Sequence, residues 1–278
     1  MGYVGGIGMI WIPGILSQCG VRLPPKGKAL NDYTWEEIRL ISDAGKASEY
    51  FSVGDRKAVT LNGTAGRLNF SNKTFYCYII GIDHNATIEG SNRIHFQFGY
   101  TTASGGVHIA FIDSGYNMGK TSNTWFNMNN ANTNSNGWKG SQMRTKIIPT
   151  FKACLPSDLQ TVLKTVTKYS DNTGGGSNTA SYVTATTDDI FLLSEFEVFG
   201  TRTSANSAEK NYQAQYAYYS AGNSKVKYRH SSTGSTAYWW LRSVRASSSR
   251  YFCVVDARGD ADYDNPIRSY GFAPAFCV

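Results

Sequence analysis

The sequence is low in charge and has no long basic run. Charged residues make up 17% of its 278 residues, and the net charge of +7 is spread along the chain. Nucleic-acid-binding domains concentrate Lys and Arg on one face or along one helix, so the pattern predicts a mildly basic surface and no nucleic-acid partner. Aromatic residues reach 14%, beside abundant Gly, Ser, Thr and Asn, which favours a β-rich chain with many loops over a helical bundle.

Metal-binding and disulfide patterns are also missing. The five cysteines are far apart and form no C-x-x-C pair, which argues against a zinc ribbon and against a disulfide scaffold. The four histidines, His84, His95, His108 and His230, do not fall at metal-ligand spacings. We therefore predict no metal and no cofactor, and buried free thiols at Cys19, Cys77, Cys154, Cys253 and Cys277.

The first residues lack the features of a secretory signal peptide. No basic region precedes the apolar run, and glycines and Pro13 interrupt it, so it is also too broken for a membrane span. We expect no signal peptide and no membrane insertion. Residues 1–30 are predicted to be an N-terminal segment that serves packing, attachment or oligomerisation.

The pattern further along indicates an α+β fold. Thr34 can cap a helix whose first turn holds Glu36 and Glu37, and Asn62-Gly63 is a hairpin-turn signal. Residues 75–84 and 93–100 read as strands, residues 155–170 as a second helix, and residues 188–200 as a strand or short helix. We expect twisted, mostly antiparallel sheets with two packed helices and long loops.

No catalytic arrangement stands out. Glu195 and Glu197 are two apart and could share a face, but no other acid–base group accompanies them, so they are interpreted as surface or scaffold carboxylates. No Ser–His–Asp or Cys–His set is evident. We therefore predict that the protein is not an enzyme.

The C-terminal stretch interleaves two kinds of residue. One set is bulky, apolar or glycine, as strands and tight turns require, with Arg242 beside it. The other set resembles an antibody-like contact surface, in which Tyr supplies area, Ser and Asn adapt, and Arg anchors. The scaffold set is Trp239, Trp240, Leu241, Arg242, Phe252, Val255, Gly259, Gly271, Pro274 and Phe276. The ligand-binding set is Arg245, Ser247, Ser249, Arg250, Tyr251, Val254, Asp256, Arg258, Asp260, Asp262, Tyr263, Asp264, Asn265, Ile267, Arg268 and Tyr270.

These motifs carry a family resemblance. The segments WWLRS, FCVV and GFAPAFCV resemble the end of the C-type-lectin-fold domains in variable proteins of diversity-generating retroelements, which also occur in phages and gut bacteria. The opening segment TWEEIRLISDAGKASEYFSVGDRKAVTLNG resembles the start of the same domain. The resemblance implies a C-type-lectin-like ligand-binding domain over residues 31–278. It also implies that residues 244–270 are a variable region rewritten by reverse transcription that mutates adenines.

The resemblance further implies a function and a location. Such a protein binds a protein or glycan receptor on a target cell, as a phage tail protein or at a cell surface, and self-association into a homo-oligomer is compatible with it. We expect a virion or cell-surface location. The resemblance would also place Cys253 and Cys277 in one sheet, where a disulfide is an alternative to two free thiols.

Three alternatives remain open at this point. The chain could be a virion or cell-surface structural or carbohydrate-binding domain of the same fold that is not diversified. Asp260, Asp262, Asp264 and Asn265 could form a calcium site, although adenine mutation of Asn codons explains the same residues. The related formylglycine-generating enzymes use cysteines in this region, which would give Cys253 and Cys277 a catalytic role.

Overall fold

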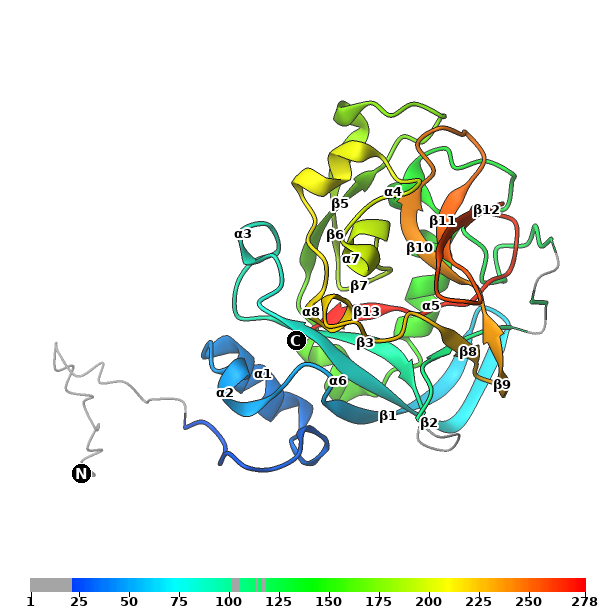
Figure 1. Cartoon of the computed structure of the whole chain (residues 1–278). Helices are drawn as coiled ribbons and strands as arrows, with labels where there is room; N and C mark the ends of the chain where they lie inside the picture. Colours follow the sequence, from blue (N-terminus) through cyan, green and yellow to red (C-terminus); the bar gives the residue numbers. More distant parts are fainter. Residues whose placement is uncertain (1–21, 102–105, 114, 117–118) are drawn as a thin grey trace, which may run out of the picture.

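The computed structural model describes residues 22–101, 106–113, 115–116 and 119–278. Most of the expected N-terminal segment, residues 1–21, lies outside the described residues. The fold is α+β, with mostly antiparallel, curled sheets and short helices (Figure 1). Among the helices described, none is long and apolar enough to cross a membrane.

The first α-helix forms as the sequence indicates. Helix α1 (Trp35–Asp43) begins after Thr34, whose side chain accepts a hydrogen bond from the Glu37 N–H while the Glu37 carboxylate accepts one from the Thr34 N–H. This capping box satisfies two donors that the first turn would otherwise leave free. Its apolar stripe, which includes Ile38 and Ile41, is buried. The predicted helix start at Thr34 is confirmed.

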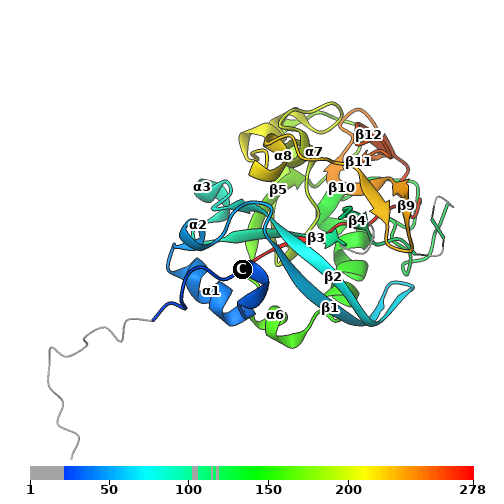
Figure 2. The ribbon, with the colours of Figure 1, turned by 60° about the horizontal axis from the view of Figure 1, so that its bottom comes forward.

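The largest sheet has five strands in the order β1-β2-β3-β13-β7, with every pairing antiparallel. Its strands are β1 (Arg56–Ala65), β2 (Leu68–Ile82), β3 (Ile94–Tyr100), β13 (Ala275–Cys277) and β7 (Ile190–Phe191). The last strand of the chain therefore lies between β3 and β7, near the middle of the molecule (Figures 1 and 2). Burial of this strand ties the C-terminal stretch to the first half of the chain.

The hairpin of β1 and β2 is present, but its turn was predicted in the wrong place. Asn62 and Gly63 lie within β1, at a shift in the strand register, and the strands are joined through Gly66 and Arg67. The Asn62 N–H donates to the Cys154 carbonyl and its Oδ1 accepts the Asn72 N–H. These contacts hold Asn62-Gly63 as a bulge, with Gly63 at φ 111°.

The second predicted helix is only half correct. Helix α6 spans Ser157–Val162 and ends there, and Val166–Asp171 form strand β5, which pairs with β6 (Val183–Asp188). The apolar residues from Leu159 to Val166 fit a helical spacing, but Val166, Lys168 and Ser170 are buried with a period of two. Pairing with a distant strand overrides the local pattern.

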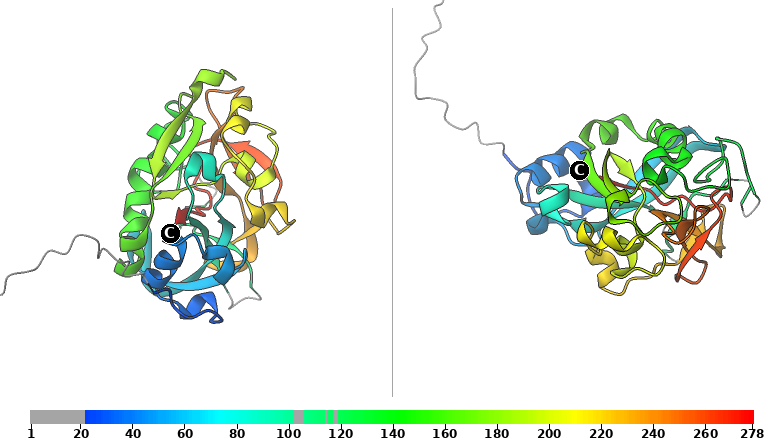
Figure 3. Two further views of the ribbon diagram at one scale, coloured as in Figure 1. Left: turned by 90° about the vertical axis from the view of Figure 1, so that its left-hand side faces the viewer. Right: turned by 90° about the horizontal axis from the view of Figure 1, so that it is seen from above.

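The C-terminal motifs build a separate three-stranded sheet. Strands β10 (Trp239–Val244), β11 (Phe252–Val255) and β12 (Ala261–Asp264) follow one another in it, at the end of the molecule away from α1 (Figures 1 and 3). A third sheet joins β4 (Ile109–Ala110), β8 (Lys227–Arg229) and β9 (Ser232–Ala237). The remaining short α-helices are α2 (Ala47–Tyr50), α3 (Ala86–Glu89), α4 (Gly137–Gly140), α5 (Ile148–Lys152), α7 (Glu195–Phe199) and α8 (Ala217–Ser220). Three 3-10 helices, Leu30–Asp32, Ala180–Tyr182 and Ser207–Asn211, and one π-helical segment, Met143–Ile147, complete the described elements.

The cysteines correct one expectation and support another. Cys253 lies in β11 and Cys277 in β13, so they belong to different sheets and not to one. Together with Cys77 and Cys154 they are buried free thiols, as predicted, and Cys19 lies outside the described residues.

Candidate functional site

A buried framework underlies the C-terminal surface. Nine of the ten predicted scaffold residues are buried, and Gly259 is partly exposed. Trp239 pairs with Val255 and Trp240 with Val254 across β10 and β11. Both indole N–H groups donate to carbonyls of distant segments, Trp239 to Lys225 at 3.0 Å and Trp240 to Phe126 at 3.1 Å. The strands are therefore fixed from both faces.

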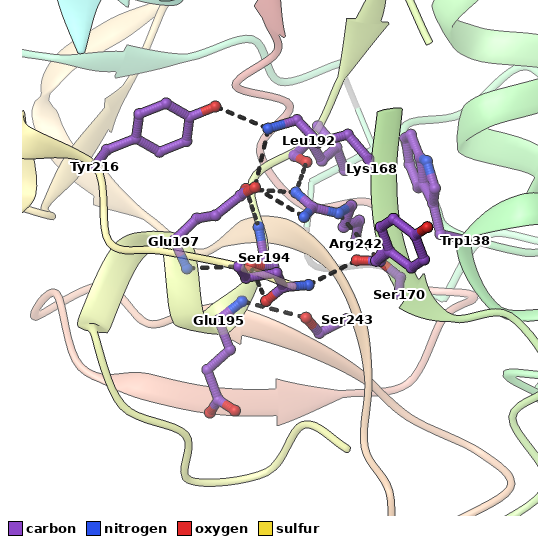
Figure 4. Close-up of polar contacts among 12 residues, drawn as sticks. Trp138, Lys168, Ser170, Leu192, Ser194, Glu195, Glu197, Tyr216, Arg242 and Ser243 are labelled. Atoms are coloured by element: carbon purple, nitrogen blue, oxygen red, sulfur yellow. Dashed lines mark hydrogen bonds and ion pairs between the residues drawn. The ribbon is translucent and has the colours of Figure 1, made fainter. Parts of the chain in front are cut away.

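Arg242 connects this framework to helix α7. Its guanidinium forms a two-pronged ion pair with Glu197, in which Nη2 lies 2.8 Å from Oε1 and Nη1 donates to Oε2 (Figure 4). It also donates to the Leu192 carbonyl and to the Ser170 hydroxyl, both at 2.9 Å. Every guanidinium nitrogen is thus engaged in a side chain that is 0% exposed. The arginine of WWLRS and the second glutamate of SEFEVFG are two halves of one buried contact.

Lys168 brings a second cation to the same carboxylate. Its ammonium lies 3.0 Å from Glu197 and also donates to the Tyr216 hydroxyl (Figure 4). The same ammonium lies 2.6 Å from Glu89. Burial raises the pKa of Glu197, but Arg242 and Lys168 outweigh burial and hold that pKa well below its usual range. Two cations and two carboxylates balance here, so this network, Lys168, Glu89, Glu197 and Arg242, holds four charges without a net excess.

Two other carboxylates secure the loops beside α7. Glu195 accepts the N–H groups of Ser204 and Ala205. Glu209 accepts the Ser243 hydroxyl at 2.7 Å, and burial raises the pKa of Glu209 to about 7. The expectation that Glu195 and Glu197 are scaffold carboxylates agrees with these contacts, although they lie on a short helix and are fully buried rather than on a surface.

The spacing of the histidines along the sequence did not reveal one cluster of possible metal ligands. His84, Glu89 and Glu197 place possible metal-ligand atoms within 4.8 Å of one another. The Nε2 atoms of His84 and His95 have no hydrogen-bond partner among the described residues. The Lys168 ammonium, however, already lies between the two carboxylates at hydrogen-bond distance. A divalent cation would have to share this buried space with Lys168, so the charges present do not fit a metal well.

Three of the sixteen predicted ligand-binding positions are buried, which corrects the expectation that all of them face outward. Val254 is opposite Trp240 in the sheet and is 0% exposed. Asp256 accepts the N–H groups of Arg258 and Asp260, which shapes the turn between β11 and β12. The third, Tyr270, is 6% exposed, and its hydroxyl donates to Asp264.

The other thirteen positions are partly or fully exposed, and they surround the edge of the three-stranded sheet. They are Arg245, Ser247, Ser249, Arg250, Tyr251, Arg258, Asp260, Asp262, Tyr263, Asp264, Asn265, Ile267 and Arg268. Within this surface, the Arg245 guanidinium lies 3.5 Å from the centre of the Tyr263 ring and 5.7 Å from that of Tyr251. The two tyrosine rings are themselves 5.3 Å apart. We name Arg245, Tyr251 and Tyr263 the Arg–Tyr cluster.

The acidic residues of the surface do not converge. Asp264 accepts hydrogen bonds from the Asn265 N–H and the Tyr270 hydroxyl, and Asp260 faces Arg258 at 3.7 Å. Asp262 accepts the Tyr263 N–H at 2.8 Å. Within the described part of the chain, the carboxylates of Asp260, Asp262 and Asp264 are not among the groups whose oxygens approach closely enough to share an ion. The calcium alternative gains no support from this arrangement.

Cys253 and Cys277 are fully buried, and burial raises the pKa of both thiols. A catalytic cysteine needs an accessible thiolate, which a raised pKa disfavours. The arrangement gives no support to a catalytic role for either residue.

An Asn-rich loop holds the surface in place, and sequence reasoning missed this role. The Asn134 N–H donates to the Ser249 carbonyl, and its side-chain amide donates to the carbonyls of Ser248 and Tyr251. Further along the surface, the Asn129 N–H donates to the Pro266 carbonyl. The run of Asn residues signals a loop, but only the fold shows which carbonyls it binds.

A groove of about 450 Å³, lined mostly by residues with polar side chains, follows the same loop. Its walls include Asn123, Asn130 and Asn136 together with Ser135 and Lys146. Amide and hydroxyl groups can both donate to and accept from a ligand rich in hydroxyls, and the Lys146 ammonium can donate to it. The groove is thus a second place where a small polar ligand could bind.

Comparison with known proteins gives one family. Searches among curated proteins and among solved structures found no match. Residues 118–278, which contain β5 to β13 and the whole candidate surface, match a family described as a domain of unknown function, DUF6273. The chain belongs to the DUF6273 family.

Proposed function

We propose that the protein binds a protein or glycan receptor through the exposed side chains of residues 244–270. The observation that carries the proposal is the separation between framework and surface. Nine of ten scaffold residues are buried, whereas thirteen of sixteen ligand-binding positions are partly or fully exposed. Exposed side chains can change with little effect on stability when the core beneath them is intact.

The proposal includes the finer identity that the resemblance implies. The fold is a C-type-lectin-like fold, and the protein is a non-enzymatic variable protein of a diversity-generating retroelement, displayed on a phage tail or a cell surface. The resemblance of both ends of the chain supports this identity. Display in several copies, including a homo-oligomer, would raise the effective affinity of a weak single site.

Deep sequencing of the 3′ end of the gene in its source population tests the proposal. We expect variation confined to codons of residues 244–270, concentrated at the thirteen exposed positions and matched by adenines in a nearby template copy. The codons for Val254 and Trp240 serve as internal controls, because both side chains are fully buried and face each other. A uniform sequence without a template copy would contradict diversification.

A second candidate function follows from the polar groove. A non-diversified carbohydrate-binding domain would use fixed amide and hydroxyl groups, such as those of Asn123, Asn130 and Ser135, rather than a variable surface. Uniform sequence in the population, together with binding to immobilised neutral glycans that Asn130→Ala abolishes, would favour this function.

A further inference from the structure

The Arg–Tyr cluster presents a guanidinium that is positioned but not neutralised. The Arg245 guanidinium stacks at 3.5 Å from the centre of the Tyr263 ring, and Tyr251 lies beside it. Stacking on an aromatic ring fixes the plane of a guanidinium and leaves the N–H groups at its edge directed outward. Less side-chain freedom is then lost when a ligand binds.

The edge of this guanidinium is free among the residues that the structure describes. It donates no hydrogen bond to them, and no carboxylate of theirs lies within 4.0 Å of it. Asp262 and Asp264 flank Tyr263 in β12 and so point to the opposite face of the strand. The hydroxyls of Tyr251 and Tyr263 likewise have no hydrogen-bond partner in the described ranges.

The other arginines of the surface differ in this respect. Arg258 is paired with Asp256 at 3.0 Å and faces Asp260, and Arg268 lies 4.0 Å from Asp264. Arg250, five residues after Arg245, is exposed and has no acidic partner in the part of the chain described. Positive charge without an internal counter-charge therefore occurs at Arg245 and Arg250, around the β10–β11 connection.

The acids beneath the cluster do not supply the missing counter-charge. Glu195 directs its carboxylate to the N–H groups of Ser204 and Ala205, and Glu209 binds Ser243. Both carboxylates are buried, and Arg245 is partly exposed. Its guanidinium therefore has no acidic partner among the residues that the structure describes.

We propose that the Arg–Tyr cluster binds a carboxylate group of the receptor. A planar guanidinium binds the two oxygens of a carboxylate through parallel N–H donors, and charge-assisted bonds of this kind are about twice as strong as neutral ones. The neighbouring tyrosine hydroxyls would bind hydroxyl or amide groups next to the carboxylate. The carboxylate can belong to an acidic sugar or to an acidic side chain. This inference rests on the proposed function, since it specifies the ligand chemistry of the same surface.

Titration of the full chain with two matched pairs of probes tests the inference. The first pair is 3′-sialyllactose and lactose, which differ by one acidic sugar, and the second is a Glu-containing peptide and the same peptide with Gln. We expect binding to at least one acidic probe, with at least about tenfold weaker binding to its neutral partner. The pair that binds identifies the source of the carboxylate.

Two variants assign the binding to the cluster. Arg245→Lys keeps the charge but loses the planar edge, so we expect about tenfold weaker binding of the acidic probe. Arg39→Lys is the matched control, because that guanidinium is paired with Asp43 on helix α1, outside the ligand-binding surface, and we expect this variant to bind as the unmodified chain does. Circular dichroism confirms that both variants fold.

Two results would overturn the inference. One is a failure of both acidic probes to bind, and the other is binding that Arg245→Lys leaves unchanged. The population sequencing described above does not depend on ligand chemistry. If the exposed codons vary but one of these two results is found, the carboxylate inference is rejected and the proposed function stands. If the codons are uniform but the acidic probe binds through Arg245, diversification is rejected and the carboxylate inference stands.

Discussion

The buried pair of Arg242 and Glu197 should contribute to stability in a strongly coupled way. Both side chains are 0% exposed, so removal of one partner leaves the other charge buried without its main counter-charge. Arg242→Met or Glu197→Gln alone should each lower the free energy of unfolding by about 3–5 kcal/mol. That is a large part of the roughly 5–15 kcal/mol that stabilises an ordinary domain.

The double variant should lose much less unfolding free energy than the sum of the losses in the two single variants. It buries neither charge of the pair, and Lys168 keeps Glu89 as its partner at 2.6 Å. A residual loss of about 1–3 kcal/mol is expected, because the Leu192 carbonyl and the Ser170 hydroxyl lose the donors of Arg242. The two substitutions should therefore show a coupling energy of at least about 3 kcal/mol, at or above the upper end for neighbouring residues.

Urea unfolding followed by circular dichroism measures all four proteins of this cycle. The control cycle uses Arg39 and Asp43, whose Nε–Oδ2 distance is 2.7 Å but whose side chains are 34% and 49% exposed. We expect only about 0.3–0.5 kcal/mol of coupling there, because water screens the pair. Additive losses in the Arg242–Glu197 cycle, or a single loss below about 1 kcal/mol, would refute the reasoning.

Three further predictions concern buried groups and the limits of the surface. Burial lowers the pKa of Lys227 to about 7, and the unfolded chain keeps that lysine charged up to about pH 10, so the native state gains stability as pH rises from 7 to 10. Lys227→Met should therefore raise the free energy of unfolding by about 1–4 kcal/mol at pH 6, as measured by thermal or urea unfolding. This gain should shrink toward pH 10, and a gain that is constant with pH would contradict the reasoning. Burial likewise lowers the pKa of His108 to about 3, so the free energy of unfolding should fall as pH drops from about 6.5 toward 3. His108→Gln should make this pH dependence shallower by about 1.3 kcal/mol per pH unit at pH 5, as measured by urea unfolding. Val254→Asp should prevent stable folding or lower the free energy of unfolding by more than about 3 kcal/mol, whereas Ser247→Asp on the exposed loop should change it by less than about 0.5 kcal/mol in urea unfolding. Equal effects would show that the surface boundary is misplaced.

Local sequence determined the features that depend on neighbouring residues. The capping box at Thr34 forms from residues three apart. The strand predicted at residues 93–100 forms as β3, and both of its faces are buried. The split between apolar framework and polar surface in the C-terminal stretch is also visible in the order of residues, because the bulky apolar motifs that form β10 and β11 stand apart from the polar stretches that follow them. Burial of Trp239 and Trp240 and exposure of Arg250 and Arg258 agree with that reading.

Only the tertiary structure decided the features that depend on distant partners. The segment after Val162 becomes a strand because β6 pairs with it, and Asn62-Gly63 becomes a bulge because Cys154 and Asn72 bind Asn62. These partners lie at sequence separations over which a local pattern carries no information.

The candidate surface shows the same division. Sequence order identified residues 244–270 but could not separate Val254 and Tyr270, which are buried, from their exposed neighbours. It also could not show that Arg242 lies against Glu197, or that Arg245 stacks on Tyr263, since each contact joins different strands, helices or loops. The interaction energy and the pKa of a charged group depend on its burial and on nearby opposite charges, and the folded chain alone sets both.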